Sequence, residues 1–349
     1  MAPSKSGRIS VRMARTVAVP RCGLPPPKEP AGTRDTGGDG FRSRQRCAHS
    51  PPDGSFIRRL IRAHCSGKGC ALMSSKTRGL VVFLALSFGG TWLWLFVAYE
   101  VLGLSALNPL LQLPAFCVPG IAAFVVRRWV TREGFADAGL RLRLKRAWPY
   151  YLLAWFGPLA IAAITLALAA ALGLWRPDLA PLDEIADGVP GWAAVLALML
   201  ALPLLTPVYW GEEFGWTSYL RPRLFGGRMA PSVIVTGLIW ASWHYPLAFI
   251  GYVEFPRLFL GLLVWTLCFQ FQETVLAWLF MRSGTIWTAS LAHAGNNMVL
   301  FLLTGQLLGS GDDGLGMVGV TLLTMIPLAG LSLWIALRPN RTVAYESSQ

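Results

Sequence analysis

The chain has 349 residues, of which 54% are hydrophobic and only 14% are charged, and its mean hydropathy is +0.49. Because soluble globular proteins carry about 25% charged residues, this composition argues against an ordinary soluble protein. The net charge of +13 would suit a nucleic-acid partner, but residues 1–72 hold 14 Lys and Arg against 4 Asp and Glu, whereas residues 73–349 hold 17 against 14. The basic charge therefore belongs mostly to one terminal segment, and we expect no nucleic-acid partner.

Residues 1–72 mix Arg, Pro, Gly and Ser without apolar periodicity. Such a segment cannot bury enough surface to offset the entropy of ordering it, so we predict a disordered basic tail. We favour Met73 as the natural start, with the tail as an over-extended gene assignment. An organellar targeting segment is an alternative, because residues 1–28 hold six basic and no acidic residues. A nucleic-acid arm and a zinc knuckle of tail cysteines are further alternatives, although the cysteine gaps fit no metal-ligand spacing well.

Residues 73–349 are expected to form one membrane domain. Segments of about 20 apolar residues are long enough to cross about 30 Å of hydrocarbon. Eight segments of this kind follow the tail: 80–100, 106–126, 148–174, 192–217, 231–252, 257–281, 284–307 and 315–337.

The loop charges test this count, because Lys and Arg collect in cytoplasmic loops. With a cytoplasmic start, 15 of the 17 basic residues after position 72 lie inside, and only Arg176 and Arg257 lie outside. The sequence thus predicts an all-α polytopic membrane protein with about eight transmembrane helices and both ends cytoplasmic. The Ala-, Arg- and Gly-rich composition favours a bacterial plasma membrane, and the lipid bilayer is an expected partner.

Ionisable side chains in membrane helices cost free energy and are functional candidates by default. They concentrate in the second half of the chain, at Glu212, Glu213, His244, Glu273 and His293. A rise of about 1.5 Å per residue places Glu213, His293 and His244 at depths of about 12, 16 and 20 Å, counted from the inner side of the membrane at residues 221, 282 and 231. These depths overlap, so one cavity in the inner half of the membrane can collect all three side chains.

Helical spacing refines this predicted cluster. Asn297 lies four residues after His293 and therefore on the same helix face. Glu212 and Glu213 are adjacent and point about 100° apart on a helix of 3.6 residues per turn. One of the two carboxylates can therefore face the cavity while the other is held elsewhere.

Two histidines, a carboxylate pair and an asparagine are typical of hydrolytic chemistry. Neutral imidazoles bind a divalent metal, zinc above all, and a carboxylate can complete the shell or act as general base on a metal-activated water. An asparagine can ligate or donate a hydrogen bond to an oxyanion. Two plainer interpretations stay open: each histidine as a helix-packing partner, and the acidic pair as a solvated membrane end.

The same residues stand in three motifs that resemble the CPBP intramembrane metalloproteases. That family includes the endopeptidases that process CAAX prenyl proteins and the Abi-like bacteriocin-immunity relatives. The match covers about residues 190–300, which we take as the motif core. The segments are Glu212 and Glu213, similar to the EExxxR block, residues 240–244 (WASWH), similar to FxxxH, and residues 293–297 (HAGNN), similar to HxxxN.

The resemblance implies hydrolysis of a peptide bond in a membrane-associated protein or peptide, within a cavity open to the cytoplasmic side. Glu212 would activate the attacking water with help from Glu213, and Asn297 would join the metal shell or steady the oxyanion. His244 and His293 would bind the divalent metal, zinc in the first place, with Glu212 as the candidate third ligand, or they would hold the attacking water.

One position departs from the family pattern. The motif arginine falls at Thr217, four residues after Glu213, where an Arg would neutralise and orient that carboxylate. We expect Thr217 to do neither. Arg221 lies about 12 Å of rise from Glu213, too far for direct contact along a straight helix. Either another cation compensates the charge of Glu213, the two carboxylates share a proton, or activity is reduced. Glu273 is a further polar residue, which either lines the cavity or packs between helices.

The sequence therefore supports an active intramembrane metalloendopeptidase as the leading hypothesis. A catalytically weak or inactive relative that works as a membrane binding or immunity protein is the second hypothesis, motivated by Thr217. A small proton-coupled transporter is the third, although transporters often carry internal repeats and none is evident here.

Overall fold

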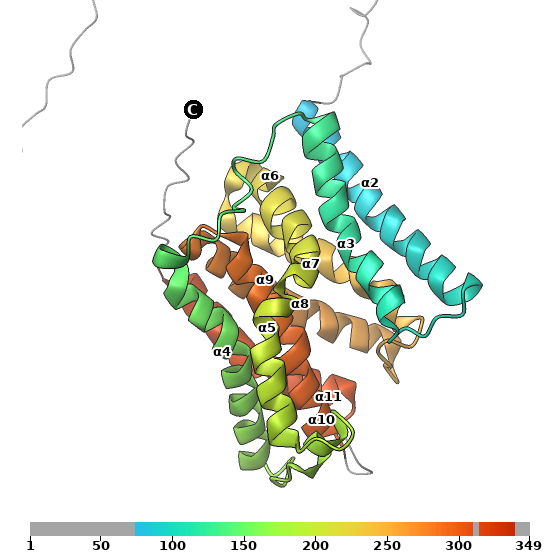
Figure 1. Ribbon diagram of the computed structural model, residues 1–349, viewed down its shortest axis with the longest axis vertical. Helices are drawn as coiled ribbons and strands as arrows, with labels where there is room; N and C mark the ends of the chain where they lie inside the picture. Colours follow the sequence, from blue (N-terminus) through green and yellow to red (C-terminus); the bar gives the residue numbers. More distant parts are fainter. Residues whose placement is uncertain (1–73, 310–313, 339–349) are drawn as a thin grey trace, which may run out of the picture. The chain divides into compact units, whose positions relative to one another are not determined.

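The computed structural model describes residues 74–309 and 314–338 (Figure 1). These residues are predominantly helical and include no strand, which confirms the all-α prediction. The predicted tail, residues 1–72, lies outside the described residues. The main helices are α2 (Ser75–Phe96), α3 (Pro109–Val125), α4 (Leu144–Ala171), α5 (Gly191–Glu213), α6 (Arg221–Arg223), α7 (Met229–His244), α8 (Leu258–Ser283), α9 (Ile286–Gly295), α10 (Leu302–Gly309) and α11 (Met317–Leu337).

Short segments with other helical hydrogen bonding continue or join these helices. Four are π-helical: η1 (Val97–Val101), η2 (Val126–Val130), η4 (Phe214–Leu220) and η7 (Asn296–Phe301). Three are 3₁₀-helical: η3 (Ala180–Glu184), η5 (Leu224–Gly227) and η6 (Tyr245–Ala248).

Six helices within the described part of the chain are long and apolar enough to cross a membrane, which confirms a polytopic membrane protein. They coincide with six of the eight predicted spans. The other two predicted spans, 231–252 and 284–307, contain the shorter helices α7 and α9. The count of eight and the cytoplasmic position of both ends stay predictions.

The helix predicted to reach residue 252 ends earlier than expected, at His244. Pro246 explains this end, because a proline has no N–H to donate and its ring clashes with the carbonyl four residues before it. The chain continues as the 3₁₀ turn η6 instead. His244 therefore stands at the last position of α7, where the α-helix passes into this tighter turn.

Large apolar side chains cover the outer faces of the long helices. Leu204 on α5 is 81% exposed and Phe259 on α8 is 87% exposed, and similar side chains lie on α2, α3 and α4. Inside, buried threonines bond to their own helices: Thr165, Thr206 and Thr304 each donate to the carbonyl four residues earlier. Apolar side chains outside and internally satisfied polar groups suit a helix bundle in lipid.

The helices that carry the three motifs have neighbours on several sides. Helix α5 contacts α3 and α9, α9 also contacts α4 and α8, and α7 packs on α8. Figure 1 shows α5 in yellow-green beside α9 in orange, with α2 and α3 side by side. Of the helices that carry the predicted site residues, α5 and α9 therefore pack directly on each other, and α7 joins them through α8 and through η4, the continuation of α5.

Glycines bring the backbones of α3 and α5 into contact just before the glutamate pair. A Cβ atom added at Gly120 would lie 2.7 Å from the carbonyl oxygen of Gly211, and one added at Gly211 would lie 2.8 Å from that of Phe116. One turn further, a Cβ atom at Gly215 would lie 2.6 Å from the Pro119 side chain. Small residues at helix crossings permit this approach in membranes, and here they fix the end of α5 against α3.

We therefore expect Gly120→Ala to lower the stability of the protein in detergent. The added methyl group meets backbone that cannot move aside locally, and overpacking of this kind costs about 1–3 kcal/mol. Gly157→Ala on α4 is the matched control, because a Cβ atom there meets nothing within 4 Å. Thermal unfolding of both purified variants checks this. Equal unfolding temperatures for the two variants would contradict the close α3–α5 contact.

Candidate active site

The glutamate pair occupies the last two positions of α5, and both side chains are buried. The π-helical segment η4 follows directly, and all seven of its residues are buried. π-Helical turns widen the backbone locally and occur frequently at functional sites. The EExxxR-like motif thus lies across a change of helical geometry rather than on one straight helix.

Glu212 faces helix α7. The indole Nε1–H of Trp240 donates a hydrogen bond of 2.7 Å to Oε2 of Glu212. Nε2 of His244 lies 3.9 Å from the same oxygen. The second motif therefore supplies two groups to the first glutamate, one of which is the predicted histidine.

The orientation of the His244 ring is fixed at its other nitrogen. Nδ1 lies 2.9 Å from the backbone carbonyl oxygen of Trp240, and because a carbonyl only accepts, the proton must be on Nδ1. In the neutral ring Nε2 is then an acceptor directed toward Glu212. The rings of Phe269 and Trp243, with centroids at 4.4 and 4.6 Å, hold the imidazole from two sides.

Glu213 faces helix α9 and its own π turn. Nδ1 of His293 lies 3.0 Å from Oε1, and the hydroxyl of Thr217 donates to Oε2. Both oxygens of this carboxylate therefore have a partner. The His293 ring lies between Tyr209 and Trp240, with ring centroids at 5.0 and 5.2 Å.

Asn297 is half-buried on η7, and its side chain lies near the Tyr209 hydroxyl. The Tyr209 ring in turn contacts the ring of His293. The structure thus brings the predicted site residues close together, four of them buried and Asn297 half-buried, and their catalytic roles stay predictions. The cluster comprises Glu212, Glu213, His244, His293 and Asn297.

The position that departs from the family motif behaves differently from the expectation. Thr217 does orient Glu213, because its hydroxyl donates to that carboxylate. Behind it, NH2 of Arg221 donates to the Thr217 oxygen, and Nε of Arg221 donates to Oε1 of Glu273 at 2.8 Å. Arg221 makes no direct contact with Glu213, as its distance along the chain predicts. Glu273 is a buried counter-ion, which neither sequence interpretation foresaw.

Two groups at the site were not foreseen as partners: the Trp240 indole and Tyr209. Trp240 precedes His244 by four residues, and Tyr209 precedes Glu213 by four residues. Residues at this spacing share one helix face. A search for polar aromatic side chains one turn before each motif residue would have found both.

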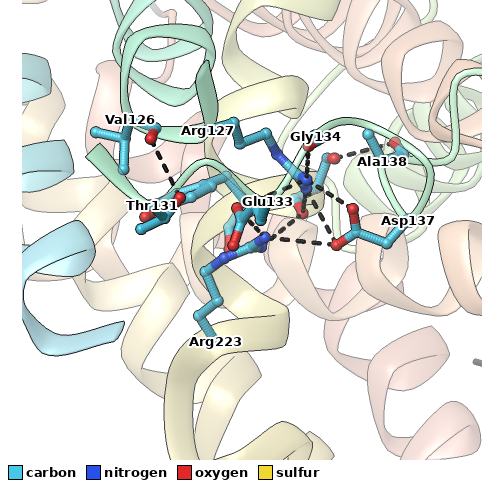
Figure 2. Close-up of polar contacts among 10 residues, drawn as sticks. Val126, Arg127, Thr131, Glu133, Gly134, Asp137, Ala138 and Arg223 are labelled. Atoms are coloured by element: carbon cyan, nitrogen blue, oxygen red, sulfur yellow. Dashed lines mark hydrogen bonds and ion pairs between the residues drawn. The ribbon is translucent and has the colours of Figure 1, made fainter. Parts of the chain in front are cut away.

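A cluster of charged residues binds the π-helical turn η4, which follows the glutamate pair (Figure 2). Arg127, fully buried at the start of η2, donates to Asp137 at 2.6 Å and to the carbonyl oxygen of Ser218 at 3.1 Å. The Ser218 hydroxyl donates a hydrogen bond of 3.0 Å to the Ala138 carbonyl oxygen. Arg223 pairs with Glu133 and Asp137 in the same cluster. Segment 133–138 is thereby tied to η4, the turn that carries Thr217.

A cavity of about 720 Å³ lies against this end of the site. Thr217 and Arg221 line it together with charged Glu133 and Arg223 and with apolar Met229 and Phe280. The cavity is therefore bounded on one side by Thr217, the residue that binds Glu213, and it combines charged with apolar walls.

The predicted metal centre was compared with the positions of possible ligands. Each histidine uses Nδ1 for a hydrogen bond, to Trp240 or to Glu213, which leaves Nε2 as the nitrogen that could ligate, and such outer partners are typical of metal-binding histidines. Among the residues described, however, no three or more His, Cys, Asp or Glu side chains are grouped so that they could hold a metal ion. The arrangement as it stands does not fit a closed zinc site.

Residues 190–299 match the sequence model of the Rce1-like family, described as type II CAAX prenyl endopeptidase Rce1-like. This segment contains all three motifs and the whole cluster around the glutamate pair. The match over residues 190–299 confirms the resemblance to CAAX proteases that the motifs predict. A comparison with curated proteins gives no match.

The charged cluster predicts how stability changes with pH. Partial burial acts to raise the pKa of Asp137, but its hydrogen bond to Arg127 and the charges of Arg127 and Arg223 outweigh burial and hold that pKa below its usual value. A carboxyl with a depressed pKa in the folded state stabilises it above the unfolded-state pKa of about 3.9, and this contribution is lost as pH falls through the lower folded-state value.

We therefore expect Asp137→Asn to lower the unfolding temperature in detergent at pH 6. The difference from the wild type should shrink as the pH is lowered toward 3. Asp178→Asn, in the loop before η3, is the control and should show no such pH-dependent difference. An Asp137→Asn difference that is the same at pH 6 and pH 3 would contradict the ion cluster.

Proposed function

We propose that this chain is an intramembrane endopeptidase in which Glu212 removes a proton from the water that attacks the peptide bond. The observation that carries the proposal is that Oε2 of Glu212 and Nε2 of His244 lie 3.9 Å apart inside the membrane domain, while Nδ1 of His244 is held by the Trp240 carbonyl. Glu212 and His244 come from two different motifs of a protease family. A buried acid beside an oriented neutral histidine is suited to general acid–base catalysis.

The two glutamates differ in how many of their carboxylate oxygens already have a hydrogen-bond partner. Both oxygens of Glu213 are engaged, one by His293 and one by Thr217. At Glu212 the Trp240 indole donates to Oε2. We therefore assign the proton transfer to Glu212 and the orientation of His293 to Glu213.

The proposed reaction balances with protein groups alone. A water molecule between Glu212 and His244 donates one hydrogen bond to the bare Nε2 and gives its other proton to Glu212 as its oxygen attacks the carbonyl carbon. We assign stabilisation of the oxyanion to the amide of Asn297, which lies on the same helical run as His293. Glu212 then returns the proton to the nitrogen of the leaving amine, and the C–N bond breaks.

We propose that the substrate approaches this site through the cavity that Thr217 borders. It lies next to Arg221 and Arg223, at the end of α5 that the distribution of basic residues predicts to be cytoplasmic. Its apolar walls suit a peptide that is itself attached to or embedded in the membrane. We propose membrane-associated peptides as the substrate class, entering from this side.

The second candidate is a non-catalytic membrane binding protein with the same fold. Thr217 is the observation that favours it, because no formal positive charge contacts Glu213 through this position. The two candidates differ in whether the chain cleaves a peptide bond at all.

We expect Glu212→Gln to abolish cleavage of a membrane-anchored peptide library by the full chain in detergent or liposomes. The amide keeps the shape of the carboxylate but cannot accept the proton, and removal of a general base costs about 10²–10⁴-fold in rate. Glu254→Gln, on an exposed loop residue, is the matched control and should retain wild-type activity. Cleavage by Glu212→Gln at the wild-type rate would remove the proposed mechanism.

A divalent metal remains part of the prediction from the family resemblance, and it can be tested separately. If one binds, the purified protein should contain it in near-stoichiometric amount, and His244→Ala and His293→Ala should each reduce that content. The metal content is measured by elemental analysis on the full chain after extensive dialysis. Metal-free protein that cleaves at the full rate would show that the carboxylate and histidine groups suffice.

A further inference from the structure

We propose that Thr217 and Arg221 together form a positioning relay for Glu213. In this relay Arg221 donates to the Thr217 hydroxyl, which in turn donates to the Glu213 carboxylate, and Glu273 balances the charge of Arg221. The inference rests on the proposed proteolytic function, because a positioned Glu213 matters only if the site reacts. It deepens that function by assigning a role to three buried residues outside the predicted catalytic set.

The first support is the order of the contacts. Thr217 donates to Oε2 of Glu213, and Arg221 donates to the oxygen of Thr217. A hydroxyl has a single proton, so a donor on its oxygen directs that proton away, toward Glu213. The direction of both bonds is therefore determined, and chained hydrogen bonds strengthen one another in a low-dielectric interior.

The second support is the helical geometry. Each step of the relay covers four residues, from 213 to 217 and from 217 to 221, and the π-helical segment η4 lies between its ends. The relay therefore spans the two turns that separate Arg221 from Glu213. A direct arginine contact, expected at position 217, is replaced by a contact through a hydroxyl.

The third support is the buried ion pair between Arg221 and Glu273, at the end of the relay away from Glu213. Arg221 is 3% exposed and Glu273 is 1% exposed, and Nε and Oε1 lie 2.8 Å apart. An isolated buried charge is too costly to persist, so Glu273 on α8 permits the guanidinium to stay buried behind Thr217. Helix α8 thereby takes part in the arrangement of a site built from α5, α7 and α9.

The same geometry predicts the effect of restoring the family arginine. Thr217→Arg would place a second guanidinium in a fully buried position already approached by Arg221. We expect this single change to lower activity rather than raise it. The exchange variant Thr217→Arg/Arg221→Thr removes the clash of charges and should recover part of the loss.

The deciding experiment compares Thr217→Val, which keeps the shape and removes the hydroxyl, with Thr217→Ser, which keeps the hydroxyl. For the full chain in liposomes, we expect Val to lower kcat by about 10–100-fold, the range for a lost hydrogen bond to a charged group, with KM unchanged. Ser should restore most of the activity. Thr304→Val, an equally buried threonine that bonds only within its own helix, is the control and should keep wild-type kcat.

A second arm removes the charge at the other end. Arg221→Met combined with Glu273→Gln takes away both buried charges at once, so no unpaired ion is left. This double variant keeps the bond from Thr217 to Glu213, so it should lose only part of the kcat that Thr217→Val loses. Adding Thr217→Val to it should cost less than the same change costs in the wild type, because the contribution of Arg221 through Thr217 is already gone.

The outcomes separate the relay from the proposed function. A wild type that cleaves, with Thr217→Val at the same kcat or Thr217→Ser as poor as Thr217→Val, overturns the relay and leaves the function standing. The relay is also overturned if the fold-losses in kcat of Thr217→Val and of Arg221→Met/Glu273→Gln simply multiply when all three changes are combined. A wild type that cleaves no peptide overturns both the function and the positioning role, while coupling of the same variants in thermal unfolding still reports the contact.

Discussion

Two adjacent carboxylates buried in a membrane domain set the main physical constraint on this protein. Consecutive residues of a helix point about 100° apart, so Glu212 and Glu213 cannot share their partners. Each must find donors of its own, because an unpaired buried charge costs several kcal/mol. Glu212 finds them on α7, and Glu213 finds them on α9 and on its own π turn. The packing of α7 and α9 around the end of α5 follows from this division.

The backbone on either side of the pair is held by two unlike contacts. Before the pair, Gly120 and Gly211 let the backbones of α3 and α5 touch. After it, Arg127 reaches from η2 to the carbonyl of Ser218 and binds Asp137 (Figure 2). Close packing is insensitive to salt, whereas the ion cluster has a buried Arg127 but partly exposed carboxylates at Glu133 and Asp137, so salt screens it in part. The glutamates thus lie between an apolar contact and a partly screened ionic one.

Much of this arrangement is readable from the sequence, and the exceptions have definite causes. The spacing of ionisable residues in apolar segments identified the cluster, because so few such residues occur there. The end of α7 was misplaced because Pro246 was not weighed against apolar continuity. The bond of Thr217 to Glu213 was missed because only charge was considered at that position. The hydrogen bond from Trp240 to Glu212 was missed because a tryptophan in a membrane helix more often packs against other helices or lies at the membrane interface. Residues 1–72 are outside the described part of the chain, so that prediction stands as made.

The contact at Thr217 changes what its departure from the motif means. An arginine there would supply two things to Glu213, a hydrogen bond and a nearby positive charge. Thr217 supplies the hydrogen bond, and Arg221 places the charge one side chain further away. Coulomb energy falls with distance, and Glu273 takes part of the field of Arg221. The geometry of the carboxylate is therefore kept while its electrostatic stabilisation is weakened, so the substitution should act on the rate of the reaction rather than on the assembly of the site.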